Sequence, residues 1–393
     1  MTAMRLRFTR LLPAGALLVA LAGGCDDNGG RLVVVDRGGV RVGPELNLFV
    51  VTTDFQTGSS SLVRGSGEVE RDVEPVSPDA VARGFGGEIY VVNRFGFDNL
   101  QVLDAETLET DRQWSTGNGS NPQDVLVIGD DAYVALYEPT TIDGAEVNGV
   151  GIFDRRDGRF VGSIDLRSFT ENSDRRPRVS RILEVDGILV FLLQDLDRNF
   201  RVEREGKVVF YDPVAGEIVD ADPSTSESDA LRLAIRNPTA AAIFEHEGRR
   251  LLAVSGAGSS FPQELTGGIE VVDPGSMTST GVVIDDDDFG GNVFDVEMIR
   301  SDLGYAVVQG PQSDDFPQLL ATFDPIAGRV MDREVHRSGG GFLPDIAATG
   351  DGRLAIAERD RERPGVVFLD LESGAAAAAI DVGLPPFSFV VID

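Results

Sequence analysis

The sequence is poor in the residue types that most often carry protein chemistry. Its 393 residues include one cysteine, two histidines (His246 and His336), one tryptophan and one lysine (Lys207). A single cysteine excludes an intrachain disulfide, a zinc site built from several cysteines and a Cys-x-x-Cys-His haem attachment. The two histidines lie far apart in sequence, which leaves little material for a histidine-based metal site.

Basic residues are also scarce relative to acids. There are 35 Lys and Arg against 65 Asp and Glu, which gives a net charge of −30 and a pI near 4.3. A surface of that sign repels phosphate backbones and anionic lipid, so nucleic-acid binding and charge-driven membrane docking are excluded. Hydrophobic residues make up 42% of the chain, which is enough for a packed core. We expect the protein to be a monomer.

The N-terminus has the pattern of a secretory signal. Arg5, Arg7 and Arg10 precede an apolar run over residues 11–21, which is shorter than the roughly 20 apolar residues that span a bilayer. The run ends in Leu-Ala-Gly-Gly-Cys at 21–25, which resembles the lipobox of bacterial lipoproteins, although the leucine stands four rather than three residues before Cys25.

The lipobox resemblance implies that a diacylglycerol is attached to Cys25. It predicts a signal peptide at 1–24, a lipidated Cys25 with a tether over 25–44, and a protein anchored in the bacterial cell envelope, periplasmic or surface-exposed. The alternative is an ordinary secretory signal with an accidental free cysteine. Residues 31–43 have no assigned role.

A pattern of short strands recurs about every fifty residues from residue 45 onward. One strand of each unit ends in an aspartate, at Asp104, Asp154, Asp212, Asp273, Asp324 and Asp370. Turn signals follow several of these, such as Pro-Val-Ala-Gly at 213–216, so we interpret the aspartates as turn formers. Further apolar, β-branched runs lie upstream, and no segment keeps a 3.6-residue apolar period.

Four strands per fifty residues is the signature of a propeller blade. Six units are complete, and a seventh at 46–75 lacks its first strand, while the chain ends on an unpaired strand at 385–393. Joining the two would remove an exposed sheet edge. The sequence therefore predicts an all-β, seven-bladed β-propeller over 45–393, closed by the C-terminal strand joining the N-terminal blade.

One unit resembles a known repeat family. Ile-Tyr-Val-Val-Asn at 89–93, followed by Val-Leu-Asp-Ala-Glu-Thr at 102–107, is similar to the YVTN-type bacterial β-propeller repeat. The resemblance implies a propeller fold and brings in propeller lactonases as relatives, whose catalytic residues cannot be mapped onto this chain. The lone Trp114 argues against a quinone-cofactor propeller dehydrogenase with repeated Trp docking motifs.

Long loops concentrate on one predicted face. Connections at 137–149, 194–206, 255–267 and 309–318, with 167–180 and 285–292, would lie on the same side of the propeller, which favours binding there. Aligned first strands place Asp79, Asp124, Ser180, Ala240, Asp295, Asp345 and Ser388 at the channel mouth. The four aspartates could hold Ca²⁺. We favour the alternative in which they accept backbone N–H bonds from their own loops.

Other charged or nucleophilic residues give weaker evidence for a metal or catalytic site. The acidic run at 285–288 lacks calcium-loop spacing, so we interpret it as a solvated loop. His246 is expected away from the long loops, and His336 near them. Residues 256–260 do not form a nucleophile elbow.

The sequence favours a non-catalytic, lipid-anchored scaffold that binds an unknown protein or small molecule through its loop-rich face. One alternative is a lactonase-type hydrolase using Asp79, Asp124, Asp295, Asp345 and His336. Another is a structural component of an envelope assembly.

Overall fold

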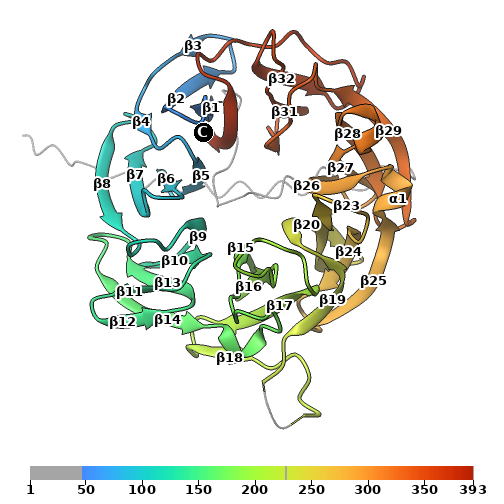
Figure 1. The fold of residues 1–393 in the computed structure, drawn as a ribbon. Helices are drawn as coiled ribbons and strands as arrows, with labels where there is room; N and C mark the ends of the chain where they lie inside the picture. The colour runs from blue at the N-terminus through green and yellow to red at the C-terminus, as the bar shows by residue number, and fades with distance from the viewer. Residues whose placement is uncertain (1–46, 226–227, 393) are drawn as a thin grey trace, which may run out of the picture. The chain divides into compact units, whose positions relative to one another are not determined.

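The computed structural model describes residues 47–225 and 228–392, which form a seven-bladed β-propeller (Figure 1). Each blade is an antiparallel sheet whose strands follow one another from the central channel to the rim. The predicted all-β class and the propeller architecture are therefore confirmed. Residues 1–46, which include the predicted signal peptide, Cys25 and the tether, lie outside the described residues.

The strands are named here from the channel outward, in blade order from one to seven. The first strands are β33 (Pro386–Ile392), β5 (Ala80–Phe85), β9 (Pro122–Ile128), β15 (Val179–Val185), β20 (Pro238–His246), β26 (Asn292–Arg300) and β30 (Ile346–Ala348). The second strands are β1 (Asn47–Thr53), β6 (Glu88–Asn93), β10 (Asp131–Leu136), β16 (Ile188–Leu193), β21 (Arg249–Gly256), β27 (Leu303–Gln309) and β31 (Arg353–Glu358). The third strands are β2 (Gly58–Arg64), β7 (Asn99–Asp104), β13 (Gly149–Asp154), β17 (Glu205–Asp212), β24 (Gly268–Asp273), β28 (Gln318–Asp324) and β32 (Gly365–Asp370).

The outer strands are less regular. In blades two, three, five and six they are β8 (Thr110–Ser115), β14 (Phe160–Asp165), β25 (Thr278–Asp285) and β29 (Arg329–Arg337). Blade one divides this position between β3 (Val69–Glu70) and β4 (Pro75–Val76), and blade four between β18 (Glu217–Val219) and β19 (Leu231–Arg236). In blade seven, isolated bridges from Val366 to Ile380 and from Leu369 to Ala376 complete the edge.

The first blade is built from both ends of the described chain. β33 pairs antiparallel with β1, with Val50 opposite Phe389, so the C-terminal strand supplies the innermost position that the N-terminal segment lacks. A pleated strand left without this partner would expose its backbone N–H and C=O groups. Pairing β33 with β1 closes the ring as the sequence predicts.

The repeated aspartates end the third strands and fix the turns that follow. Asp104 Oδ1 accepts from the backbone N–H groups of Glu106 and Thr107, at 2.9 and 2.8 Å. Asp324 Oδ1 makes the equivalent bonds to Ile326 and Ala327, at 3.0 and 2.9 Å. A short side-chain acceptor at this position replaces the backbone partner that the turn lacks. Their interpretation as turn formers is confirmed.

The hydrophobic core consists of seams between neighbouring blades. One buried cluster joins Phe49 of blade one to Ile89 of blade two, and another joins Phe368 of blade seven to Leu48 of blade one. Because each sheet is apolar on both faces, it is buried only when a blade stands on either side. Closure of the ring therefore leaves every seam covered.

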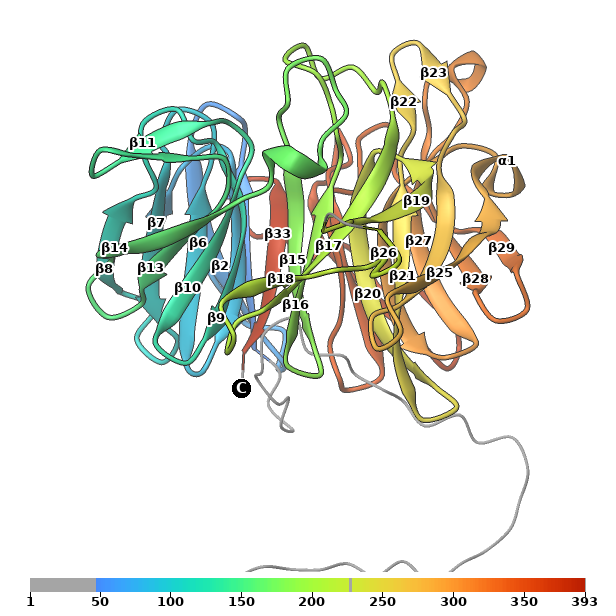
Figure 2. The same cartoon turned by 90° about the horizontal axis from the view of Figure 1, so that it is seen from below.

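The two sides of the propeller differ in the length of their connections. We call one side the loop face: it carries the loops between second and third strands and those leading into each first strand. It holds the hairpins β11 (Thr140–Ile142) with β12 (Ala145–Val147) and β22 (Ser259–Ser260) with β23 (Gln263–Glu264), together with α1 (Asp286–Phe289) (Figure 2). It also holds two 3-10 helices, η1 (Arg167–Phe169) and η2 (Gln312–Asp314). The opposite side, with short turns, is the turn face. The described residues contain no helix that is long and apolar enough to cross a membrane.

Candidate functional site: the loop face and the central channel

Exposed aromatic side chains gather on the loop face. Among the described residues, the phenylalanines that are at least 52% exposed all lie in loops between second and third strands: Phe55, Phe95, Phe97, Phe200 and Phe261. They come from blades one, two, four and five. Large exposed aliphatic residues lie elsewhere, such as Val214 and Ile326 in turns after third strands. Aromatic side chains supply large contact areas at protein interfaces, so the loop face is the candidate site.

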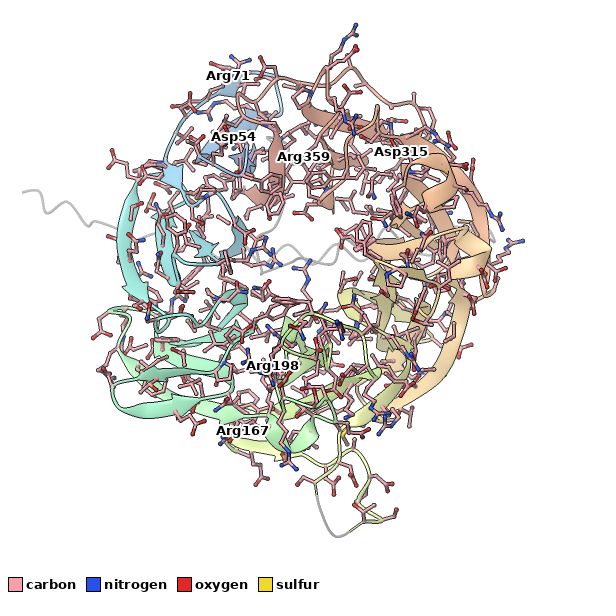
Figure 3. The ribbon with its side chains drawn as sticks, viewed as in Figure 1. Asp54, Arg71, Arg167, Arg198, Asp315 and Arg359 are labelled. Carbon is pink, nitrogen blue, oxygen red and sulfur yellow. The ribbon has the colours of Figure 1, made fainter. Side chains whose placement is uncertain are left out.

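An arginine on the same face is enclosed by three aromatic rings. The guanidinium of Arg359, which follows β31, lies 4.6, 4.9 and 5.9 Å from the ring centroids of Phe55, Phe342 and Phe387. Its Nη1 donates to the carbonyl oxygens of Pro385 and Pro386, both at 3.1 Å. Burial lowers the pKa of Arg359 to about 10, so the side chain stays charged at neutral pH. Figure 3 shows Arg359 beside the central opening, whereas Arg71 lies at the outer rim.

A second arginine supports the loop of blade four. Arg178 is fully buried, and its guanidinium lies 4.3 Å from the ring centroid of Phe200 and 5.3 Å from that of Tyr137. Its Nη1 is bonded to Glu138, and its Nη2 donates to the carbonyl oxygen of Asp197 at 3.1 Å. Burial raises the pKa of Tyr137 to about 12, so the phenol stays neutral. These contacts hold Phe200 in place while more than half of it remains exposed.

The chain's lysine anchors the loop that leads into blade four. Lys207 Nζ donates to the carbonyl oxygen of Phe169 at 2.8 Å and lies 3.3 Å from Asp195 Oδ2. Asp195 is fully buried and also accepts from the backbone N–H of Glu171 and Asn172. A buried charge must be matched in this way. Lys207 therefore has a structural role in the loop that holds η1.

The residues at the channel mouth differ from those predicted. In each blade, one first-strand residue pairs with the same position of the second strand, and we call these seven residues the ring. They are Val81, Asp124, Arg181, Ala240, Asp295, Asp345 and Ser388. Asp79 lies nearer the loop face, because its carbonyl oxygen accepts from Arg94 N at 3.0 Å, and its carboxylate pairs with Arg94. Ser180 is the extra residue of a β-bulge, and Arg181 takes the ring position.

Irregular register explains the difference. Blades one, three, four, five and six have a β-bulge at this level of the first strand, and blade two has none. Because a bulge inserts one residue, the pairing of first and second strands cannot be found by counting residues from the turn that joins them. The structure thus brings three of the four predicted aspartates to one level and adds an arginine.

The ring side chains join neighbouring blades. Asp124 Oδ2 accepts from Ile182 N of the next blade at 3.0 Å, and Asp345 Oδ2 accepts from Phe389 N at 2.8 Å. Ser388 Oγ accepts from Ala82 N at 3.3 Å. The channel-side edge of a first strand has no sheet partner, so these side chains satisfy its N–H groups. The acceptors serve the adjacent blade rather than their own loop.

Asp295 lies in blade six at the same level. Its Oδ1 accepts from Val296 N at 2.9 Å. Among the described residues, no three His, Cys, Asp or Glu side chains gather closely enough to form a metal site. The contacts made by Asp124 and Asp345 account for their burial without a cation.

The two histidines occupy opposite ends of the propeller. His246 ends β20 at the turn face. His336 lies in β29, and its Nε2 is 2.8 Å from Oε2 of the buried Glu358 in blade seven. Ser338 also binds Glu358, on its other oxygen. In a nucleophilic triad the histidine stands between the hydroxyl and the acid. Here the acid, Glu358, stands between His336 and Ser338, so these three residues do not have the order of a triad.

The acidic run differs from a fully solvated loop. Asp285 caps α1, since its Oδ1 accepts from Asp287 N at 3.1 Å. Asp286 is completely buried and accepts from Gly267 N at 2.8 Å. Burial, reinforced by Asp285 and Asp287, raises the pKa of Asp286 to about 7. The solvated interpretation therefore fails for Asp286 and applies to Asp287 and Asp288, which are exposed.

Two cavities meet in the channel at the level of the ring. A cavity of about 200 Å³ opens toward the loop face and is lined by polar residues such as Arg94, Gln123 and Gln194. A cavity of about 480 Å³ lies below it, along the first strands of blades two to six. Arg83 and Arg181 line both. Sequence reasoning missed these arginines. The signal available was that Arg83 is the one charged residue of β5, whereas β15 also carries Ser180 and Glu184 and gives a weaker signal.

Several solved structures are similar to this chain at low sequence identity. One is dihydro-heme d1 dehydrogenase NirN in complex with DHE, with 15% identity, a TM-score of 0.51, and coverage of 91% of this chain and 77% of that one. Another is apo AztD from Citrobacter koseri, with 12% identity, a TM-score of 0.52, and coverage of 88% and 98%. A third, from Bacteroides fragilis, is described as a candidate 6-phosphogluconolactonase, with 14% identity, a TM-score of 0.56, and coverage of 89% and 98%.

Identities this low show the propeller fold alone. No protein-family model and no curated protein matches the sequence.

Proposed function

We propose that this protein is a lipid-anchored β-propeller of the bacterial envelope that binds a protein partner through its loop face, without catalysis. The observation that carries the proposal is the placement of every exposed phenylalanine of the described residues in a loop of that face. Binding energy at protein interfaces concentrates on aromatic and arginine side chains. The loop face presents the aromatic groups, and Arg359 and Arg178 hold Phe55 and Phe200 in fixed positions.

Preorganisation supports the same function. An aromatic side chain that is already ordered loses less conformational entropy when a partner covers it. Phe55 packs against Phe342 with ring centroids 6.1 Å apart and against Phe387 at 5.7 Å. Phe261 contacts Phe316 at 5.1 Å. Phe55 and Phe261 are thus supported by neighbouring rings while more than half of each remains exposed.

The experiment compares two double variants of the full-length protein as baits for the solubilised envelope. Phe95→Ser with Phe261→Ser removes two exposed rings from the loop face. Val214→Ser with Ile326→Ser removes two exposed side chains from the turn face and is the matched control. Each ring that a partner covers contributes a large apolar contact, so we expect the loop-face variant to retain less than a tenth of the partner. Equal retention by both variants would contradict the proposal.

The lipid anchor has a separate test. Cys25→Ser removes the thiol to which the diacylglycerol would be attached, so the variant should leave the membrane fraction and incorporate no labelled fatty acid. A wild-type protein that takes up no label would show that residues 1–24 are an ordinary signal peptide. The result would leave the binding role of the loop face untouched.

A further inference from the structure

In the part of the chain that the structure describes, none of the exposed loop-face phenylalanines lines the lower channel cavity. Its volume of about 480 Å³ lies within the range of roughly 300–1,000 Å³ that small-molecule sites occupy. It extends from Asp124 at the ring to Gly187 and Val214 at the turn face. Its walls are largely apolar, with Phe85, Val127, Leu183, Ile243 and Met298 among them.

Arg83 stands at the upper end of this cavity with one donor unused. Its side chain is 8% exposed; Nε lies 2.8 Å from Asp124 Oδ1, and Nη1 donates to the carbonyl oxygen of Ala82 at 2.7 Å. Its Nη2 is buried and has no hydrogen-bond partner among the described residues. An unsatisfied buried donor is costly, because the group has lost its water without gaining an acceptor. A ligand acceptor in the cavity would remove that cost.

The charges around Arg83 limit the kind of acceptor. Arg83, Arg94 and Arg181 line the upper cavity, together with the carboxylate of Asp345. The lower cavity balances three arginines against three acids: Arg83, Arg181 and Arg250 against Asp124, Glu184 and Glu297. Among the lining residues, positive charge therefore exceeds negative charge only in the upper cavity, by two charges. Asp124 and Asp295 also lie at the ring, so a head group with one negative charge meets less repulsion there than a dianion.

We propose that the channel binds a small amphipathic carboxylate, with its head group at the ring and its apolar body in the lower cavity. The head group accepts from Arg83 Nη2 and lies beside Arg181 and Arg94. The apolar body packs against Leu183 and the other hydrophobic walls. The site depends neither on the lipid anchor nor on the loop-face partner.

The test uses the full-length protein and dodecanoate below its micelle-forming concentration, measured by isothermal titration calorimetry. Wild type should bind dodecanoate with 1:1 stoichiometry and bind dodecanol and dodecyltrimethylammonium at least tenfold more weakly. Arg83→Gln should weaken dodecanoate binding by a factor of ten to a hundred, since one charge-assisted bond is lost. Arg337→Gln, at an exposed site on β29, is the matched control and should bind like wild type.

A second variant keeps the test decisive if Arg83→Gln fails to fold. Ala241 lines the lower cavity, so Ala241→Phe should fill it and abolish binding while leaving the ring intact. Ala145→Phe, on the exposed hairpin strand β12, is its control. The proposal is overturned if wild type does not bind dodecanoate, if dodecanol binds equally well, or if Ala241→Phe binds like wild type. Unchanged dodecanoate binding by Phe95→Ser with Phe261→Ser would show that this site and the loop face are independent.

Discussion

The guanidinium of Arg359 lies 4.6 Å from the ring centroid of Phe55 and thereby joins blade seven to blade one, where the propeller closes. Phe387, on the strand that completes blade one, lies on the same guanidinium. The closing seam is therefore held by a charged group among aromatic rings as well as by the pairing of β33 with β1.

Replacing this arginine should weaken the seam. Arg359→Met keeps an apolar stem but loses the cation–π contacts and the two bonds to the carbonyl oxygens of Pro385 and Pro386, which should lower the free energy of unfolding by about 1–3 kcal/mol. The matched control is Arg361→Met, an exposed neighbour, which should stay within about 0.5 kcal/mol of wild type. Urea unfolding measures both. Identical midpoints for the two variants would show that the aromatic cage does not stabilise the closure.

Asp286 should make stability depend on pH. Folding raises the pKa of its carboxyl from 3.8 to about 7, chiefly by burial, so the folded state binds a proton that the unfolded state has released. The contribution is complete below pH 4 and is lost as pH rises to 7, with a slope of up to about 1.4 kcal/mol per pH unit. Asp286→Asn keeps an acceptor for Gly267 N and should remove this slope.

The measurement is the free energy of unfolding at several pH values for wild type, Asp286→Asn and the exposed control Asp288→Asn. Only the difference from wild type reports on Asp286, because other groups titrate in the same range. If Asp286→Asn and Asp288→Asn both keep the wild-type slope, Asp286 ionises in the folded protein as it does in water.

Calcium should not stabilise the folded protein specifically. Asp124 is bound to Arg83 and Ile182 N, and Asp345 to Phe389 N, so a cation at the ring would compete with existing contacts. Melting curves in CaCl₂ and NaCl at matched ionic strength should coincide, since both salts screen the negative surface. A rise specific to calcium that disappears in Asp124→Asn with Asp345→Asn would instead establish the carboxylate ring as a calcium site.

Features that depend on local sequence patterns could be predicted from the sequence. Aspartates before Pro or Gly predict the turns after third strands, and the unpaired strand at 385–393 predicts the composite blade. The channel ring needed the three-dimensional register. The first strand of blade two lacks the bulge found in most other blades, which leaves Asp79 outside the ring, and the bulge at Ser180 brings Arg181 into it. The aromatic rings around Arg359 could not be predicted from the sequence either. Phe55, Phe342 and Phe387 lie in separate segments, and no regular spacing in the sequence relates them. Asp286 is buried because the fold packs α1 against β24 and β26, where the backbone N–H of Gly267 donates to its carboxylate.

The most direct test of the loop-face function is site-specific photo-cross-linking in living cells. A photoreactive side chain is placed at Phe97 or Phe261 on the loop face and, for comparison, at Val214 or Ile326 on the turn face, all four exposed. The account predicts one covalent adduct of the same mass from both loop-face positions and none from the turn face. Adducts from the turn-face positions alone, or no adduct from either loop-face position, would contradict it.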